Sequence, residues 1–196
     1  VTKLGGMSVI GVDDNADNSV LDAGGNYSMF QLTDDGVTLS LQNVTVKNAK
    51  TGDTTGSDKA SAIYVAHENA TVDLNNVKFK DNKENAIDNK GTVNLTNVTF
   101  ETPESSYDNK IKNAGVMNVI GGENLFKSDI ENVSGTFNVG ELDEDGNLKN
   151  SVVMTVATDS TPVVFSNTNG ATLNIYGTVN LDENATLSND GTVNIN

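Results

Sequence analysis

The chain has 196 residues, of which 36% are hydrophobic and 5% aromatic, and its 27 acidic and 12 basic residues give a formal net charge of -15. This charge repels phosphate backbones, so nucleic acid is excluded as a partner. The chain has no cysteine, which excludes disulfides and thiolate metal sites. No apolar run approaches the roughly 18 residues of a membrane-spanning helix, and we expect no direct membrane insertion in this segment.

The first 36 residues contain short strand-like segments separated by glycine and aspartate, at Met7–Gly11, Ser19–Gly25 and Tyr27–Leu32. A stronger pattern follows them, because one line of sequence occurs three times, at 37–46, 70–79 and 91–100. Each copy reads as two short strands with alternating apolar and polar residues, joined at an asparagine. A line that repeats in this way predicts one unit of a stacked β-structure.

The joining asparagines are Asn43, Asn76 and Asn97. Asparagine tolerates the left-handed backbone region that a sharp corner requires, and its amide can hydrogen-bond an equivalent amide on the next unit. We therefore predict that these three residues form a structural asparagine ladder.

Weaker copies follow at 115–119, 135–139, 170–175 and 191–195. The starts at Gly91, Gly115 and Gly135 lie 24 and 20 residues apart, which is the length of one three-sided turn. The sequence thus predicts an all-β fold, a right-handed parallel β-helix with three short strands and roughly 20–24 residues per coil. We expect one domain over residues 1–196, with about seven or eight coils and a length of about 35–40 Å. We also expect it to be a segment of a longer protein.

A third, shorter strand should complete each coil. The candidates are short apolar segments, several of them followed by asparagine and glycine, at 62–65, 86–87, 110–111, 124–126, 163–165 and 185–187.

Two stretches interrupt the repeat, at about 48–60 and 140–150, and we expect both to project as loops. The candidate binding residues in these loops are Asp53, Asp58, Lys59, Glu141, Asp143, Asp145 and Asn147. The oxygens of Asp143, Asp145 and Asn147 are spaced as in the opening of a calcium loop, but the bidentate acid expected 12 positions in would fall at Met154. Surface calcium and a solvated acidic loop both remain open, and we expect no other cofactor.

The chain resembles the right-handed parallel β-helix passenger regions of bacterial surface adhesins, which are pectin-lyase-like and include autotransporters and polymorphic outer-membrane proteins. The matching segments are 20–26 with 30–32, then 41–46, 61–64 and 79–82. One pair of family glycines is replaced here by Ala60 and Ser61. The resemblance implies export to the bacterial cell surface or secretion, and a role in cell adhesion, aggregation, biofilm formation or virulence.

The function we expect is attachment, to a host surface protein or glycan or to another copy on a neighbouring cell. A polysaccharide-binding or polysaccharide-degrading module and a passive stalk are the alternatives. We expect no enzyme, because the lyases of this fold commonly use arginine as the base and the chain has none. The adjacent acids at 13–14 and 34–35 would point to opposite faces of a strand, and His67 is the only histidine.

Overall fold

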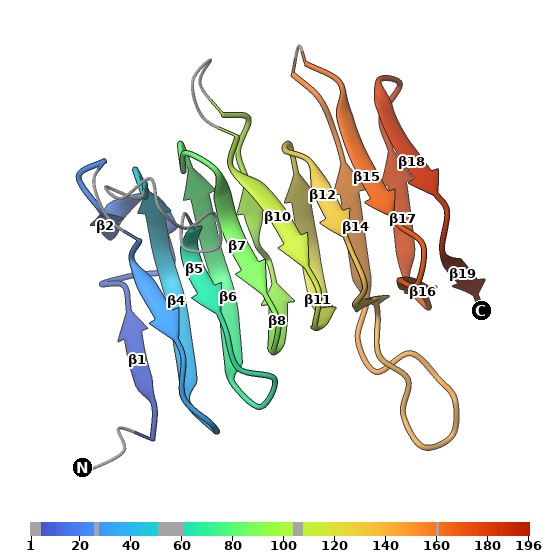
Figure 1. Ribbon diagram of the computed structural model, residues 1–196, viewed down its shortest axis with the longest axis horizontal. Coiled ribbons are helices and arrows are strands. Elements are labelled where there is room, and N and C mark those ends of the chain that lie inside the picture. The colour runs from blue at the N-terminus through green and yellow to red at the C-terminus, as the bar shows by residue number, and fades with distance from the viewer. Residues whose placement is uncertain (1–4, 26–27, 51–60, 104–107, 160) are drawn as a thin grey trace.

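The computed structural model describes residues 5–25, 28–50, 61–103, 108–159 and 161–196. Within these ranges the chain is mostly β-strand, with one short 3-10 helix, η1 (Ala16–Asn18). The strands form two sheets, and the pairings between the named strands are parallel (Figure 1). The prediction of an all-β fold is confirmed.

In the described part of the chain the larger sheet has twelve strands and the smaller sheet has seven. The larger sheet contains β1 (Met7–Ile10), β2 (Val20–Asp22), β4 (Thr38–Lys47), β6 (Thr71–Lys80), β8 (Thr92–Thr96), β9 (Thr99–Phe100), β11 (Val116–Phe126), β13 (Thr136–Val139), β14 (Val152–Val156), β16 (Thr172–Ile175), β17 (Thr178–Leu181) and β19 (Thr192–Ile195). The smaller sheet contains β3 (Phe30–Leu32), β5 (Ser61–Val65), β7 (Asn85–Asn89), β10 (Lys110–Asn113), β12 (Ile130–Asn132), β15 (Val163–Asn167) and β18 (Ala185–Asn189).

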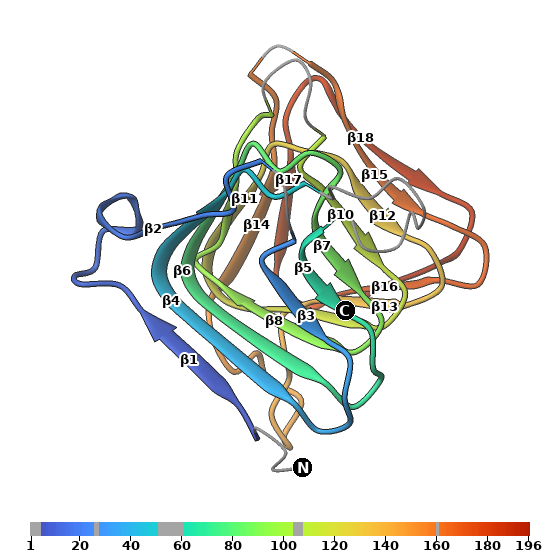
Figure 2. The same cartoon turned by 60° about the vertical axis from the view of Figure 1, so that its left-hand side comes forward.

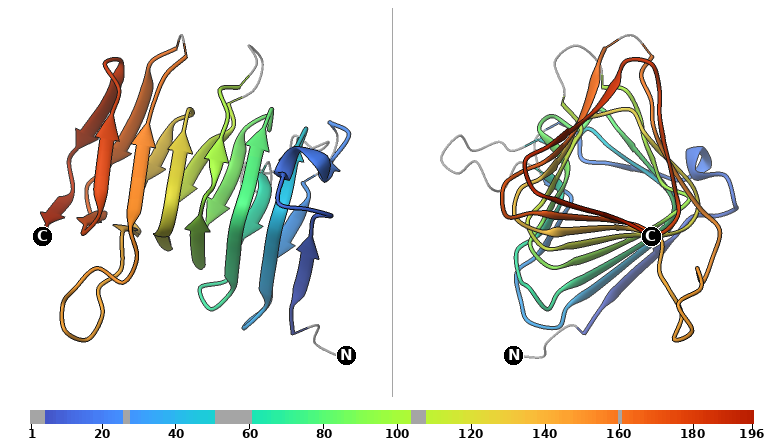
Figure 3. Two further views of the ribbon diagram at one scale, coloured as in Figure 1. Left: turned by 180° about the vertical axis from the view of Figure 1, so that it is seen from behind. Right: turned by 90° about the vertical axis from the view of Figure 1, so that its right-hand side faces the viewer.

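From β3 onward the chain passes repeatedly between the two sheets, and each passage lies beside the preceding one. Figure 2 shows β4, β6 and β8 side by side, and the end-on view in Figure 3 shows the successive passages overlaid in a three-sided outline. Thr71 pairs with Thr92, 21 residues later, but Thr136 pairs with Thr172, 36 residues later. The longer interval contains the loop between β13 and β14, which projects from the body (Figure 1).

The strands follow from the alternation of apolar and polar residues, as β6 illustrates. Val72 and Leu74 point inward and are at most 2% exposed, whereas Asp73 between them is exposed. At Asn76 the backbone takes a φ of 53°, and the alternation restarts with Val77 buried. One left-handed residue therefore bends the strand without exposing its apolar side.

Parallel, in-register pairing places like residues above one another in the core. The rings of Phe79, Phe100 and Phe126 stack with centroid separations of 4.9 and 5.0 Å. These separations match the roughly 4.8 Å between neighbouring strands, so the core is a stack of equivalent layers.

One predicted strand is placed differently. Residues 124–126 were expected beside the other short strands, but they belong to β11 and pair with β9 and β14 in the larger sheet. Gly122 takes the left-handed corner position that Asn76 holds in β6, and β11 continues past it as β6 does. Residues 124–126 are therefore the second half of that strand, and the smaller sheet receives Ile130–Asn132 instead. The other five segments do lie in the smaller sheet.

Candidate functional site

The larger sheet presents a regular polar surface along β6, β8, β11, β13, β16 and β19. Because these strands pair in register, equivalent side chains form two rows that cross the strands. The threonine row contains Thr71, Thr92, Val116, Thr136, Thr172 and Thr192. The outer asparagine row contains Asp73, Asn94, Asn118, Asn138, Asn174 and Asn194. We call the surface formed by these two rows the outer face.

Hydrogen bonds connect the whole outer asparagine row in one direction. Each asparagine Nδ2 donates to the side-chain oxygen of the preceding strand, over 2.7 Å from Asn94 to Asp73 and 2.8 Å in each other pair. The row ends on the Asp73 carboxylate, which when ionised can only accept. That carboxylate therefore fixes the direction in which every amide of the row is turned.

A second row lies inside the molecule, where strands of the smaller sheet end. This inner asparagine row contains Asn89, Asn113, Asn132, Asn167 and Asn189, joined by side-chain hydrogen bonds of 2.7–2.8 Å. Here each Nδ2 donates toward the following strand, the opposite direction to the outer row. The first four members are at most 1% exposed, so their amides are satisfied by one another and by backbone groups.

The corner asparagines predicted as a ladder all adopt the left-handed backbone conformation, with φ values of 57° at Asn43 and 53° at both Asn76 and Asn97. Asn76 Nδ2 donates to Asn43 Oδ1 over 2.9 Å. Asn97 Oδ1 instead accepts the backbone N–H of Glu123 over 3.1 Å, because Gly122 lies opposite it in β11. The structure thus brings Asn43 and Asn76 together and gives Asn97 a backbone partner.

The predicted insertion at 140–150 is a hairpin that leaves the body beside the outer face. It begins at Gly140, whose φ of 95° favours glycine. Leu142 and Leu148 form an antiparallel bridge, and the Lys149 backbone N–H donates to the Glu141 carbonyl over 2.8 Å. The Lys149 ammonium also contacts the Glu141 carboxylate. The base of the hairpin is therefore held by both main-chain and charged contacts.

At the tip of this hairpin, Asp143 organises a turn. Its Oδ1 accepts the backbone N–H of Asn147 over 2.8 Å and that of Asp145 over 3.0 Å. These hydrogen bonds hold the pKa of the Asp143 carboxyl below its ordinary value, and the one from the Asn147 backbone has the largest effect. No group of three or more acidic, histidine or cysteine side chains suited to a metal occurs in the described ranges. Calcium at Asp143, Asp145 and Asn147 stays a prediction.

The other candidate binding residues, Asp53, Asp58 and Lys59, lie outside the described residues. The acids weighed as catalytic pairs lie in turns. Asp13 Oδ1 accepts the backbone N–H of Asn15 over 2.9 Å, and Asp35 Oδ1 accepts from the Asn69 amide over 2.9 Å.

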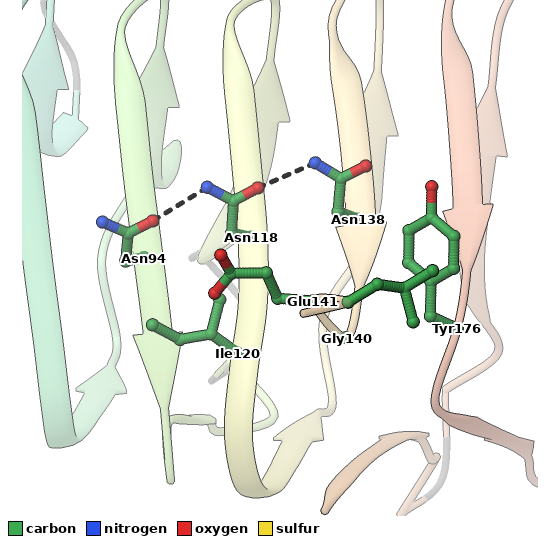
Figure 4. Close-up of a pocket in the computed structure, with 8 residues that line it drawn as sticks. Asn94, Asn118, Ile120, Asn138, Gly140, Glu141 and Tyr176 are labelled. Atoms are coloured by element: carbon green, nitrogen blue, oxygen red, sulfur yellow. Dashed lines mark hydrogen bonds between the residues drawn. The ribbon is translucent and has the colours of Figure 1, made fainter. Parts of the chain in front are cut away.

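A groove of about 500 Å³ lies where the hairpin meets the outer face. Its floor is formed by the amides of Asn94, Asn118 and Asn138. Figure 4 shows these amides in a row, with the Glu141 carboxylate beside Asn118 and the Tyr176 ring beyond Asn138. The groove thus combines amides, a carboxylate and an aromatic ring at one place.

Sequence reasoning missed most of these residues, although signals for both rows exist. The outer row occupies one fixed position of the repeat, the residue two after the threonine in Thr92-Val93-Asn94. The inner row precedes the repeat glycine, as in Asn89-Lys90-Gly91, and was interpreted only as a turn. No local signal could bring Tyr176 to the groove, because its position depends on the pairing of Thr136 with Thr172, 36 residues later.

In the comparisons with known proteins, no family model matches the chain, and neither a curated protein nor a solved structure does. The described ranges contain no helix with the length and apolar character that crossing a bilayer requires.

Proposed function

We propose that the chain is a right-handed parallel β-helix that serves as an adhesive, non-enzymatic segment of a cell-surface protein. The β-helix proposal is supported by the parallel register of successive passages and by their three-sided outline (Figure 3). Left-handed asparagines at the corners, such as Asn43 and Asn76, support it as well. A rigid stack of this kind offers a long side surface while its core stays narrow.

The observation that carries the adhesive role is the outer face itself. Over six paired strands it repeats two side-chain positions at strand spacing, all of them polar except Val116, and a hairpin stands beside it. A regular polar surface of this length can engage an extended partner at many weak contacts, which together give a high avidity. Attachment to a neighbouring cell or to host material is the function that such a surface supports.

Charge also favours contact with surfaces that are not strongly acidic. With a formal net charge of -15, the protein stays soluble and is repelled by bare anionic polymers. Apart from the Asp73 carboxylate, the hydrogen-bonding groups of the outer face are amides and hydroxyls, which bind without charge pairing. Such contacts persist at the salt concentrations found outside cells, where charge interactions are screened.

The test is an attachment assay with beads coated with the whole chain. Beads are scored for aggregation with one another and for binding to cultured host cells. In the test variant, Leu142–Leu148 is replaced by Asn-Gly, which closes the hairpin between Glu141 and Lys149, two residues already joined in the main chain. We expect attachment to fall severalfold, with a far-UV spectrum that stays β-rich.

A matched control alters the smaller sheet, where Glu131→Gln changes an outward charge away from the outer face. This control should attach as the original chain does. A second test variant, Thr136→Lys, places a bulky cation in the middle of the threonine row. If the original chain attaches to nothing, or if both test variants attach normally, the proposed role of this surface is wrong.

A further inference from the structure

The geometry points to a binding site for a neutral glycan in the groove between the outer asparagine row and the hairpin. This inference rests on the proposed function, because it names the ligand class for the same surface. The groove has the volume typical of sites that enclose a small ligand. The identity of the ligand follows from three features of its walls.

The first feature is the unused hydrogen-bonding capacity of the floor. A side-chain amide offers two N–H donors and two acceptor lone pairs. Asn94, Asn118 and Asn138 each donate one hydrogen bond and accept one within the row. Each amide thus retains one donor and one acceptor that the row does not use. A hydroxyl group both donates and accepts, so a ligand rich in hydroxyls matches this floor.

The second feature is the apolar part of the walls. The Tyr176 ring closes one end of the groove and the Ile120 side chain contributes to its side (Figure 4). An aromatic ring offers a large contact area at a small loss of side-chain freedom. Sugar rings carry C–H groups on their faces and hydroxyls at their edges. A sugar ring lying against Tyr176 would direct its hydroxyls toward the amide floor.

The third feature is charge, which separates neutral from acidic glycans. Glu141 is the charged residue of the groove wall, and its carboxylate is paired with Lys149. A carboxylate in this pair can still accept a hydroxyl hydrogen bond, although the pair carries little net charge. The next member of the row beyond Asn94 is the Asp73 carboxylate. Asp73 and the net charge of -15 repel a uronate and favour a ligand without negative charge.

The amides of the floor follow one another from strand to strand, at about 4.8 Å. An oligosaccharide bound here would therefore lie along the stack of strands, across their direction. Tyr176 and Asn118 would contact successive parts of it.

The test measures binding of soluble oligosaccharides to the whole chain by calorimetry. The neutral probes are cello-, chito- and manno-oligosaccharides, and the acidic probe is an oligogalacturonide. We expect at least one neutral probe to bind and the acidic probe not to bind. Failure of every neutral probe, or binding of the acidic probe alone, would overturn the inference.

Three variants locate the site. Tyr176→Ala should weaken the binding of the neutral probe about tenfold, and Tyr176→Phe should restore most of it, because the ring is retained. Asn118→Ala should weaken binding by about threefold to tenfold. The control is Asn180→Ala on β17, which changes an exposed asparagine that belongs to neither row of the outer face and does not line the groove.

Thermal unfolding is recorded for each variant, and binding is compared at a temperature at which all of the variants are folded. If Asn180→Ala weakens binding as much as Asn118→Ala, or if neither Tyr176→Ala nor Asn118→Ala weakens it, the groove is not the site. The bead assay separates this inference from the function. Beads that attach normally while the chain binds no neutral probe would refute the glycan site and leave the adhesive function standing.

Discussion

The inner asparagine row should be a main source of stability, and Asn113→Ala tests this. Asn113 is 0% exposed. Its Nδ2 donates to Asn132 Oδ1 over 2.8 Å and to the Thr136 carbonyl over 3.1 Å, and its Oδ1 accepts from Asn89 over 2.8 Å. The substitution removes the amide but leaves its partners in place.

The magnitude follows from what happens to those partners. Asn89 Nδ2 keeps the Val116 carbonyl, which accepts from it over 2.9 Å. Asn132 Oδ1 loses its donor, and Asn132 is 0% exposed. The Thr136 carbonyl loses one donor but belongs to a half-buried residue paired with β11. A buried polar group left without a partner costs about 1–3 kcal/mol, so the loss at Asn132 lowers the free energy of unfolding by about 1–3 kcal/mol.

The comparison variant is Asn118→Ala, which removes the equivalent two hydrogen bonds from the outer row. Asn118 is partly exposed, so water can replace its lost partners. We expect this variant to lose about 1 kcal/mol or less. Both changes lie in the same coil, on β10 and β11, so the surrounding structure is matched.

Urea unfolding followed by circular dichroism and by tyrosine fluorescence provides the assay. With an m value of about 2 kcal/mol/M, Asn113→Ala should lower the midpoint by about 0.5–1.5 M, a larger shift than that of Asn118→Ala. The two signals must coincide for this conversion to hold, because a stack of repeats can unfold in parts. Equal midpoints for the two variants would refute the argument that burial makes the inner row important.

Three further predictions concern the core, a corner and the hairpin. Phe100→Ala removes the middle ring of the stacked phenylalanines and should lower the free energy of unfolding by about 3–5 kcal/mol, measured in urea. Gly122→Ala should destabilise by about 1–3 kcal/mol in the same assay, because φ is 67° and a Cβ would lie 1.8 Å from a side-chain oxygen. Acidification through the lowered pKa of Asp143 should release the Asn147 amide, measured by NMR hydrogen exchange.

Each of these has its own control. Phe100→Leu should cost clearly less than the alanine change, and an equal loss would contradict the role of the ring stack. Gly121→Ala is the neighbour of the corner glycine, and its Cβ would be 3.4 Å from the nearest atom, an ordinary contact. If it destabilises as much as Gly122→Ala, the corner is not the cause.

The sign of the acid effect follows from the direction of the pKa shift. A carboxyl whose pKa is lowered by folding stabilises above its unfolded pKa of about 3.8 and loses this contribution as the pH falls through the lower folded value. Protection of the Asn147 amide should therefore be constant above about pH 5 and should fall below the unfolded pKa. If the Asn147 amide is unprotected already at neutral pH, or if its protection does not fall in acid, Asp143 does not hold the turn.

The sequence made the strands and corners predictable because both depend on local chemistry. Alternation of apolar and polar residues places Val72 and Leu74 inside, and the restart of that alternation marks the corner at Asn76. The hairpin at 140–150 was predictable because it interrupts the repeat. In each case a few neighbouring residues carry the information.

What could not be predicted depends on distances along the chain. Residues 124–126 were misplaced because Gly122 stands where the other corners have asparagine, which hides their correspondence with the residues that follow Asn97. Tyr176 reaches the groove only because Thr136 pairs with Thr172. The register of a coil with a long insertion is set by the packing of the whole layer, and no short pattern reports it.

The two asparagine rows have a consequence for how long such a structure can become. Side-chain amides carry dipoles, and a row of aligned amides sums them along the stack. The outer row donates toward the first strand and the inner row toward the last, so their dipoles oppose one another. Each added coil contributes one amide to both rows, and the two contributions largely cancel. The protein could therefore gain coils without building up the electrostatic cost that a single aligned row would impose.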